Sequence, residues 1–342
     1  MTRLATITLI AAALVGVACS EHHGAAAAAG GADAGRAGGA DAGRALGPGG
    51  AADAGGAVAA GGAAGASSAC GDTPEPSSWA SWVMPNPVQS ELPNLASYAV
   101  SDSGNQVTDQ VTGLTWQRNV DSSAMTWDVA TRYCACLTLD DDGGWRLPSR
   151  IELASLVDWT TASPSIDSAA FPSTTNENFW TSSLVKTDPG LVYLVFFLNG
   201  HTTYAALDYA YRTRCVRSSP ATPAEHYTVA NGTVHDTQTT LTWQQAFPPE
   251  RYTWADAQTY CAGLSLDGAG WRVPSINELQ TLVDDSTNPA VDLTAFPLTP
   301  SEYFWSSSAV VDDATRAWTT FFTNGSTYSF AITAPKNVRC VR

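Results

Sequence analysis

The chain has 342 residues, with 17 lysines and arginines against 32 aspartates and glutamates, a formal net charge of −15 and a pI near 4.5. A chain this acidic is a poor ligand for polyanions, so we expect no nucleic acid partner. Only 14% of the residues are charged, against roughly 25% in an average soluble protein. Glycine, alanine, serine, threonine and aromatic residues take their place, which is typical of exported surface proteins.

The N-terminus has the form of an export signal. Arg3 precedes an apolar stretch, Leu4 to Ala18, which is too short to span a membrane comfortably. Its end, Gly16-Val-Ala-Cys19, resembles the lipobox of bacterial lipoproteins, in which the cysteine is acylated and becomes the new N-terminus. We therefore predict a signal peptide over residues 1–19, lipidation of Cys19 and an outer-membrane or cell-surface lipoprotein held to the membrane by this lipid alone. The alternative is an ordinary secreted protein.

The next segment, residues 20–69, consists almost entirely of alanine and glycine and contains a near-repeat of Gly-Gly-Ala-Asp-Ala-Gly-Arg-Ala. It has almost no large apolar side chains to bury, so we predict a disordered tether. Without a strict Gly-X-Y period, the segment is not collagen-like.

The remainder is an internal duplication. Leu114-Thr-Trp-Gln117 recurs as Leu241-Thr-Trp-Gln244, and Gly144-Trp-Arg-Leu-Pro-Ser149 recurs as Gly270-Trp-Arg-Val-Pro-Ser275. Both copies end in Arg-Cys-Val-Arg, and the spacing between matching motifs drifts only from 127 to 125 residues. Nearly every element of one copy is therefore present in the other.

The extent of the repeated motifs predicts two tandem domains, residues 98–217 and residues 225–342, joined by a short linker rich in serine and proline. Residues 70–97, which contain Trp79 and Trp82, form an N-terminal extension that we expect to pack on the first domain.

Two helices are predicted in the first half of each copy. Thr126 and Thr253 are N-cap residues that precede amphipathic stretches. Ser149 and Ser275 each begin a capping box, Ser-x-x-Glu, that leads into apolar residues at helical spacing.

The second half of each copy reads as short strands. In the first copy these are residues 179–183, 192–197, 201–206 and 214–217. Asn199-Gly200 and Asn324-Gly325 are good hairpin turns. The element order predicts an α+β fold, in which each domain has two helices and a small, mainly antiparallel sheet, with its first and last strands together.

The chain has seven cysteines. If Cys19 carries lipid, six remain, an even number that predicts disulfides in an exported chain. The second copy contains only two, so the repeat selects one set of pairs: Cys261–Cys340, Cys134–Cys215 and Cys70–Cys136. Zinc binding at Cys134-Ala-Cys136 is disfavoured, because one intervening residue is the wrong spacing and no histidine cluster accompanies it.

The motifs in this order resemble the Lcl C-terminal domain family: Gly232-Thr-Val-His-Asp236, Leu-Thr-Trp-Gln, Gly-Trp-Arg-Leu-Pro-Ser, Phe-Trp-x-Ser-Ser and Arg-Cys-Val-Arg. The resemblance implies a C-type-lectin-like fold for both domains, and a bridge from the first helix to the last strand is a feature of that fold. The family is named for a bacterial collagen-like adhesin, so the resemblance also implies surface adhesion and binding of sulfated glycosaminoglycans.

The charge of this chain argues against a sulfated ligand. Residues 70–342 carry 14 basic and 28 acidic side chains, and sulfated polymers need basic clusters. The only dense groups are Arg212, Arg214 and Arg217, and Lys336, Arg339 and Arg342. We therefore expect the partner to be a neutral glycan or a surface protein.

We predict no enzyme, no catalytic residues, no cofactor and no metal. The histidines of the predicted domains, His201, His226 and His235, are not repeated between the copies, and no Ser-His-Asp constellation is recognisable. The run from Asp140 to Asp142 is interpreted as an acidic turn rather than as a calcium site, because its counterpart keeps a single aspartate, Asp267.

Aromatic and amide side chains outside the repeated positions form the candidate ligand site. The repeated tryptophans are expected to lie in the core. The remaining aromatic residues, with nearby asparagines, would provide a sugar-stacking surface, and the competing interpretation is ordinary strand and turn residues. The candidates are Trp159, Asn176, Asn178, Tyr204, Tyr209, Tyr211, Tyr303, Trp318 and Tyr328.

The sequence thus predicts a non-catalytic, surface-displayed binding or adhesion module, with carbohydrate as the candidate ligand. The main alternative is a structural cell-envelope protein whose duplicated domains mediate protein–protein assembly. An enzyme acting on envelope polymers is the least favoured reading.

Overall fold

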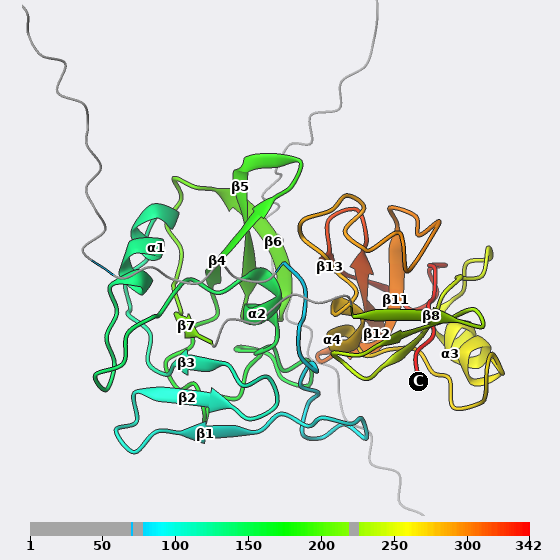
Figure 1. Cartoon of the computed structure of the whole chain (residues 1–342), viewed down its shortest axis with the longest axis horizontal. Coiled ribbons are helices and arrows are strands. Elements are labelled where there is room, and N and C mark those ends of the chain that lie inside the picture. The colour runs from blue at the N-terminus through cyan, green and yellow to red at the C-terminus, as the bar shows by residue number, and fades with distance from the viewer. Residues whose placement is uncertain (1–69, 71–77, 219–225) are drawn as a thin grey trace, which may run out of the picture. The chain divides into compact units, whose positions relative to one another are not determined.

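The computed structural model describes Cys70, residues 78–218 and residues 226–342 (Figure 1). The predicted signal peptide, Cys19 and the predicted tether lie outside these described residues. Within the described ranges, no helix has the length and apolar character needed to cross a membrane.

The first repeat has two antiparallel sheets, with two helices between them in the sequence. The four-stranded sheet has the order β1-β2-β3-β7, from β1 (Tyr98–Val100), β2 (Gln106–Asp109), β3 (Thr115–Gln117) and β7 (Val216–Arg217). The three-stranded sheet consists of β4 (Asn178–Val185), β5 (Asp188–Phe196) and β6 (His201–Ala206). The helices are α1 (Trp127–Ala135) and α2 (Arg150–Ala154).

The second repeat has the same plan (Figure 1). One sheet contains β8 (Tyr227–Ala230), β9 (Thr233–Asp236) and β10 (Thr242–Gln244), and the other contains β11 (Tyr303–Val310), β12 (Asp313–Phe321) and β13 (Ser326–Ala331). Its helices are α3 (Trp254–Ala262) and α4 (Ile276–Gln280). The predicted α+β class is confirmed, whereas the C-type-lectin-like assignment stays a prediction.

Local sequence explains where the helices begin. The Ser149 hydroxyl accepts a hydrogen bond from the Glu152 backbone N–H, and the Glu152 carboxylate accepts one from the Ser149 N–H. Ser275 and Glu278 form the same capping box in the second repeat. At the start of each of these two helices, two backbone N–H groups that have no partner within the helix thereby gain a hydrogen-bond acceptor.

The end of each repeat lies beside the opening strands of that repeat, as predicted, although in the first repeat β1 and β7 occupy opposite edges of the sheet. In the first repeat β7 pairs with β3, where Trp116 lies opposite Val216. In the second, Val341 forms isolated bridges to Trp243 and Arg272. The disulfides Cys134–Cys215 and Cys261–Cys340 join α1 and α3 to these terminal segments, and Cys70–Cys136 is also present. All three predicted bridges are confirmed.

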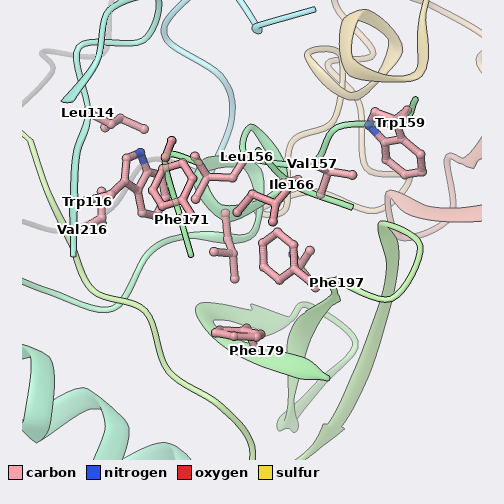
Figure 2. Packing of buried hydrophobic residues seen from close by; sticks show 14 of the residues in the cluster. Leu114, Trp116, Leu156, Val157, Trp159, Ile166, Phe171, Phe179, Phe197 and Val216 are labelled. Carbon is pink, nitrogen blue, oxygen red and sulfur yellow. The ribbon is translucent and has the colours of Figure 1, made fainter. Parts of the chain in front are cut away.

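The core of the first repeat contains the repeated aromatic residues. Trp116, Phe171, Phe179 and Phe197 are fully buried in one cluster, with Trp159 at the opposite end from Trp116 (Figure 2). The matching tryptophans Trp145, Trp180, Trp243, Trp271 and Trp305 are also buried. Their predicted role in the core is confirmed, whereas Trp127 and Trp254, for which the same role is predicted, are only partly buried and pack against the clusters.

The two repeats pack against each other through equivalent positions. Thr202 and Thr327 each lie three residues after the asparagine of a repeated Asn-Gly turn. The Thr202 backbone N–H donates to the Thr327 hydroxyl at 3.0 Å, and the Thr327 N–H donates to the Thr202 hydroxyl at 2.9 Å. Reciprocal contacts between equivalent residues are the mark of an approximate two-fold relation.

The N-terminal extension contacts both repeats rather than only the first. Ala80 and Met84 are buried in a cluster with Ile151 of the first repeat. Pro85 accepts a hydrogen bond through its carbonyl from the Asn277 side chain of the second repeat, and the Ser78 hydroxyl donates to Asp284 at 2.9 Å. This segment therefore fixes the two repeats to each other.

Candidate ligand-binding surface

Two of the predicted ligand-contacting residues are buried, and that prediction is wrong for them. Trp159 and Trp318 are only 5% and 4% exposed and meet edge to face at 4.9 Å between ring centroids. The Trp159 indole N–H donates to the Asn277 side-chain oxygen at 2.7 Å. Both indoles serve the contact between the repeats, and although they line a pocket of about 270 Å³ there, they expose too little surface for a ligand to stack on.

The structure does bring Tyr303 and Tyr328 together, with two residues that the sequence analysis did not select, Phe321 and Phe330. Tyr303 lies opposite Phe321 in the β11–β12 pairing, and Tyr328 follows on β13. The Tyr303 ring stacks on Phe321 at 4.3 Å and meets Tyr328 edge to face at 5.5 Å and Phe330 at 4.7 Å. Side chains alternate along strands, so these four share one face of the sheet.

Two further side chains complete this group. The Lys336 ammonium lies 3.5 Å from the Phe330 ring centroid and 5.0 Å from that of Tyr303, within cation–π range. His201 of the first repeat meets Tyr328 edge to face at 5.4 Å. We call these six side chains the aromatic surface: His201, Tyr303, Phe321, Tyr328, Phe330 and Lys336. All six of them are partly buried.

Burial shifts the pKa values of three members of the aromatic surface. Burial lowers the pKa of His201, which favours its neutral form. Burial, and after it the neighbouring Tyr303 and Tyr204, raise the pKa of Tyr328. The pKa of Lys336 is lowered by burial and by Arg251, while Glu302 acts in the opposite direction.

A polar rim borders the aromatic surface. The Arg251 guanidinium donates to Glu302 Oε1 at 2.5 Å, and the Asn337 side chain donates to Glu302 Oε2 at 2.9 Å. This rim provides hydrogen-bonding groups beside the aromatic rings, the arrangement usual for sites that orient a polar ligand on an apolar floor.

The first repeat has the same strands without this aromatic surface. Counting from the shared Phe-Trp and Asn-Gly motifs, the positions of Tyr303, Tyr328, Phe330 and Lys336 are occupied by Asn178, Thr203, Ala205 and Tyr211. Phe321 has an aromatic equivalent, Phe196, but because the first repeat forms its sheet with the other residues, the fold does not require Tyr303, Tyr328 and Phe330. The sequence signal that would have identified Phe330 is the difference between the two copies at this position, where the first copy has Ala205.

The remaining candidates lie elsewhere. Tyr209 is 59% exposed and stacks loosely on Tyr211, with ring centroids 6.3 Å apart. Tyr204, 44% exposed on β6, raises the pKa of Tyr328, but its ring meets Tyr193 and not the rings of the aromatic surface. Asn176 is exposed before β4, and the buried side-chain oxygen of Asn178 accepts no hydrogen bond from the residues that the structure describes. These residues do not join the aromatic surface.

The two dense basic groups do not form polyanion-binding clusters. Arg214 is fully buried and donates to the carbonyls of Gln117 and Arg118, and Arg339 repeats this with Gln244 and Gln245. Their outer arginines are engaged in ion pairs, Arg212–Glu177, Arg217–Asp142 and Arg342–Asp267, and Lys336 lies over the Phe330 ring.

The acidic run from Asp140 to Asp142 forms a hydrogen-bonded turn. Asp140 accepts from the side chains of Ser103, Asn105 and Gln106, and these bonds lower its pKa. In the described part of the chain, no group of three or more His, Cys, Asp or Glu side chains is arranged to hold a metal ion.

Comparison with protein families finds the Lcl C-terminal domain twice, over residues 105–217 and over residues 232–342. A search of curated proteins finds no match. The two matches coincide with the two repeats and cover more than half of the chain. The chain therefore belongs to the Lcl C-terminal domain family, as a tandem pair of these domains.

Proposed function

We propose that this protein is a non-catalytic binding module, displayed outside the cytoplasm, that holds a neutral glycan on the aromatic surface of its second repeat. The observation that carries the proposal is the group formed by Tyr303, Phe321, Tyr328 and Phe330, which the first repeat lacks on the same framework. Three disulfides support an oxidising compartment.

The chemistry of the surface favours a sugar ring over a polyanion. Aromatic rings provide large, rigid contact areas with few rotatable bonds, onto which the apolar face of a pyranose packs. In the rim, the solvent-accessible side chains of Arg251 and Glu302 supply donors and acceptors for hydroxyl groups, and the buried Asn337 holds Glu302 in place. Lys336 is the only cation within the aromatic surface at neutral pH, too few for a sulfated polymer.

The test is a glycan-array screen of the oxidised full chain against two variants. The first carries Y303N and Y328T, which introduce the first-repeat residues and therefore preserve a strand pairing already known to form. The second is Y209A, which removes an exposed tyrosine away from the aromatic surface.

We expect specific binding by the full chain and by Y209A, and a loss of at least about tenfold in Y303N/Y328T, because hot-spot aromatic residues carry most of the binding energy in such sites. A blank array for the folded protein contradicts glycan binding and favours protein–protein assembly. Equal binding by all three proteins places the glycan elsewhere.

A further inference from the structure

Each repeat contains a groove at the same place. The first groove has a volume of about 440 Å³ and is lined by Tyr98, Asp158 and Asp167. The second has a volume of about 530 Å³ and is lined by Tyr227, Asp284 and Asp292. These residues are equivalents: each tyrosine opens the first strand of its repeat, one aspartate follows a Leu-Val pair, and the other precedes the Ala-Phe-Pro motif by three residues.

The four carboxylates each use only one oxygen. Asp158 Oδ1 accepts from the backbone N–H and hydroxyl of Thr160, at 2.8 and 2.6 Å. Asp167 Oδ1 accepts from the N–H groups of Ala169 and Ala170. Within the described residues, Oδ2 of both aspartates makes no hydrogen bond, and the side chains are half-buried.

The second groove repeats this pattern. Asp284 Oδ1 accepts from the Ser286 N–H and from the Ser78 hydroxyl, and Asp292 Oδ1 accepts from the Thr294 N–H at 2.7 Å. Oδ2 of both aspartates is again without a hydrogen bond in the described ranges. Each of these carboxylates is held in place through Oδ1. Its Oδ2 is therefore a fixed hydrogen-bond acceptor for a donor group of a ligand.

The tyrosine hydroxyls are also unused. Tyr98 packs edge to face on Phe171 at 5.2 Å and Tyr227 on Phe296 at 5.2 Å, so both rings are fixed alike. Neither hydroxyl makes a hydrogen bond within the described part of the chain. Burial raises the pKa of both, and next Asp109 or Asp236 and then the two groove aspartates of each repeat act in the same direction, while Arg339 acts on Tyr227 in the opposite direction.

No lysine or arginine among the described residues lines either groove. The apolar lining includes Leu156 and Ile166 in the first groove, and Leu282 and Val291 in the second. Two partly buried carboxylates without a cation favour a cationic ligand, since a half-buried carboxylate gains from a charge-assisted hydrogen bond. The apolar lining suits the carbon skeleton that carries the charge.

We propose that each groove binds a primary ammonium group on an apolar stem, with the two aspartate Oδ2 atoms and the tyrosine hydroxyl as its acceptors. Such a group is supplied either by a lysine side chain of another protein or by an amino sugar. The inference concerns residues outside the aromatic surface and does not depend on the proposed glycan site.

The second groove has a natural reporter. His226 lines it and is stacked between Trp79, at 4.1 Å, and Tyr227, at 3.8 Å, with its ring nitrogen 3.2 Å from Asp236 Oδ1. Its NMR resonances therefore report ligand entry there, while the amide of Ser168 reports on the first groove.

The test is an NMR titration of the oxidised full chain with Nα-acetyl-lysine N-methylamide and with glucosamine. Their neutral counterparts, the Nε-acetylated lysine derivative and N-acetylglucosamine, are the matched controls. We expect an ammonium ligand to bind at least about tenfold more tightly than its acetylated counterpart, the size of one charge-assisted hydrogen bond. Binding of the lysine derivative alone identifies a protein side chain, and binding of glucosamine alone identifies an amino sugar.

Variants localise the binding. D158N/D167N should abolish the Ser168 response and leave that of His226, and D284N/D292N should do the reverse. D313N is the matched control, because Asp313 Oδ1 caps Thr315 as Asp158 caps Thr160 but lies outside both grooves. If a double variant fails to fold, Y98F and Y227F remove only the hydroxyl and should weaken binding several-fold.

The proposal is overturned if neither ammonium ligand binds, if the acetylated compounds bind equally well, or if the groove variants respond as D313N does. Retained glycan binding with no ammonium binding would overturn this inference alone and leave the proposed function in place.

Discussion

Arg150 of the first repeat and Asp285 of the second form a buried ion pair, with Arg150 Nη2 2.8 Å from Asp285 Oδ1. The same guanidinium donates to the Gln280 side chain at 2.7 Å and to the Gly325 carbonyl at 3.1 Å. Across the approximate two-fold relation, the equivalents of Arg150 and Asp285 are Ile276 and Trp159, which lie in one apolar cluster. One half of the contact is thus ionic and the other half apolar.

Replacing Arg150 by alanine should lower the free energy of unfolding by about 3–5 kcal/mol, because Asp285 would stay buried without its partner. The double variant R150M/D285L should recover part of this loss, since it removes both charges, although the Gln280 and Gly325 oxygens lose their donor and Ser183 loses the Asp285 carboxylate. Urea denaturation with the disulfides intact measures both. An equal decrease in the free energy of unfolding in R150A and in R150M/D285L would contradict this account.

Local features of this fold could be predicted because their causes are local. The capping boxes at Ser149 and Ser275 depend on residues three apart, and the hairpin turn at Asn199-Gly200 on a dipeptide. The disulfide pairs are long-range, yet the duplication limits them, because the second repeat has no cysteines other than Cys261 and Cys340.

The contact between the repeats could not be predicted in this way. Trp159 lies in a loop of its own repeat, and only the packing of Asn277 and Trp318 against it makes it a core residue. For the candidate site, the sequence predicts Tyr303 and Tyr328 as ligand contacts because they are aromatic residues outside the repeated positions. Phe321 and Phe330 were missed because strand alternation alone does not tell which face stays uncovered.

Gly325 should tolerate alanine poorly compared with another glycine of similar backbone. Its φ is +72°, and an added Cβ would lie 2.3 Å from Val283 Cγ1 and 2.9 Å from Arg150 Nη2. Gly113, with a φ of +74°, has nothing within 4 Å of such a Cβ. G113A should cost only backbone strain, about 1–2 kcal/mol, and G325A about 1–3 kcal/mol more. Chemical denaturation of the pair checks this, and equal losses would show that the contact relaxes freely.

The two intra-repeat disulfides should contribute nearly equally to stability. They close loops with sequence separations of 81 and 79 residues, and all four cysteines are fully buried. In the chain-entropy model each contributes about 4 kcal/mol. C134A/C215A and C261A/C340A should therefore lower the free energy of unfolding by similar amounts in urea. A large difference between them would mean that packing around the bridge, and not loop closure, sets its effect.

Acid should destabilise the protein partly through His201. Burial lowers the pKa of this imidazole below its ordinary value of 6.5, so as the pH falls through 6.5 the unfolded chain takes up the proton first. Stability is therefore full above pH 6.5 and declines as the pH falls toward the lower pKa of the folded state. H201S introduces the residue found at the equivalent Ser326 and should reduce this decline, measured as the urea midpoint between pH 7 and pH 5.

The matched control is H235T, since His235 is exposed on β9 and its equivalent in the first repeat is Thr108. H235T should keep the acid-dependent loss of the parent protein. If instead H201S and H235T alter the pH dependence alike, the loss arises from the general charge of the chain. The contact between His201 and Tyr328 would then hold no proton-linked stability, and acid would not selectively disturb the aromatic surface.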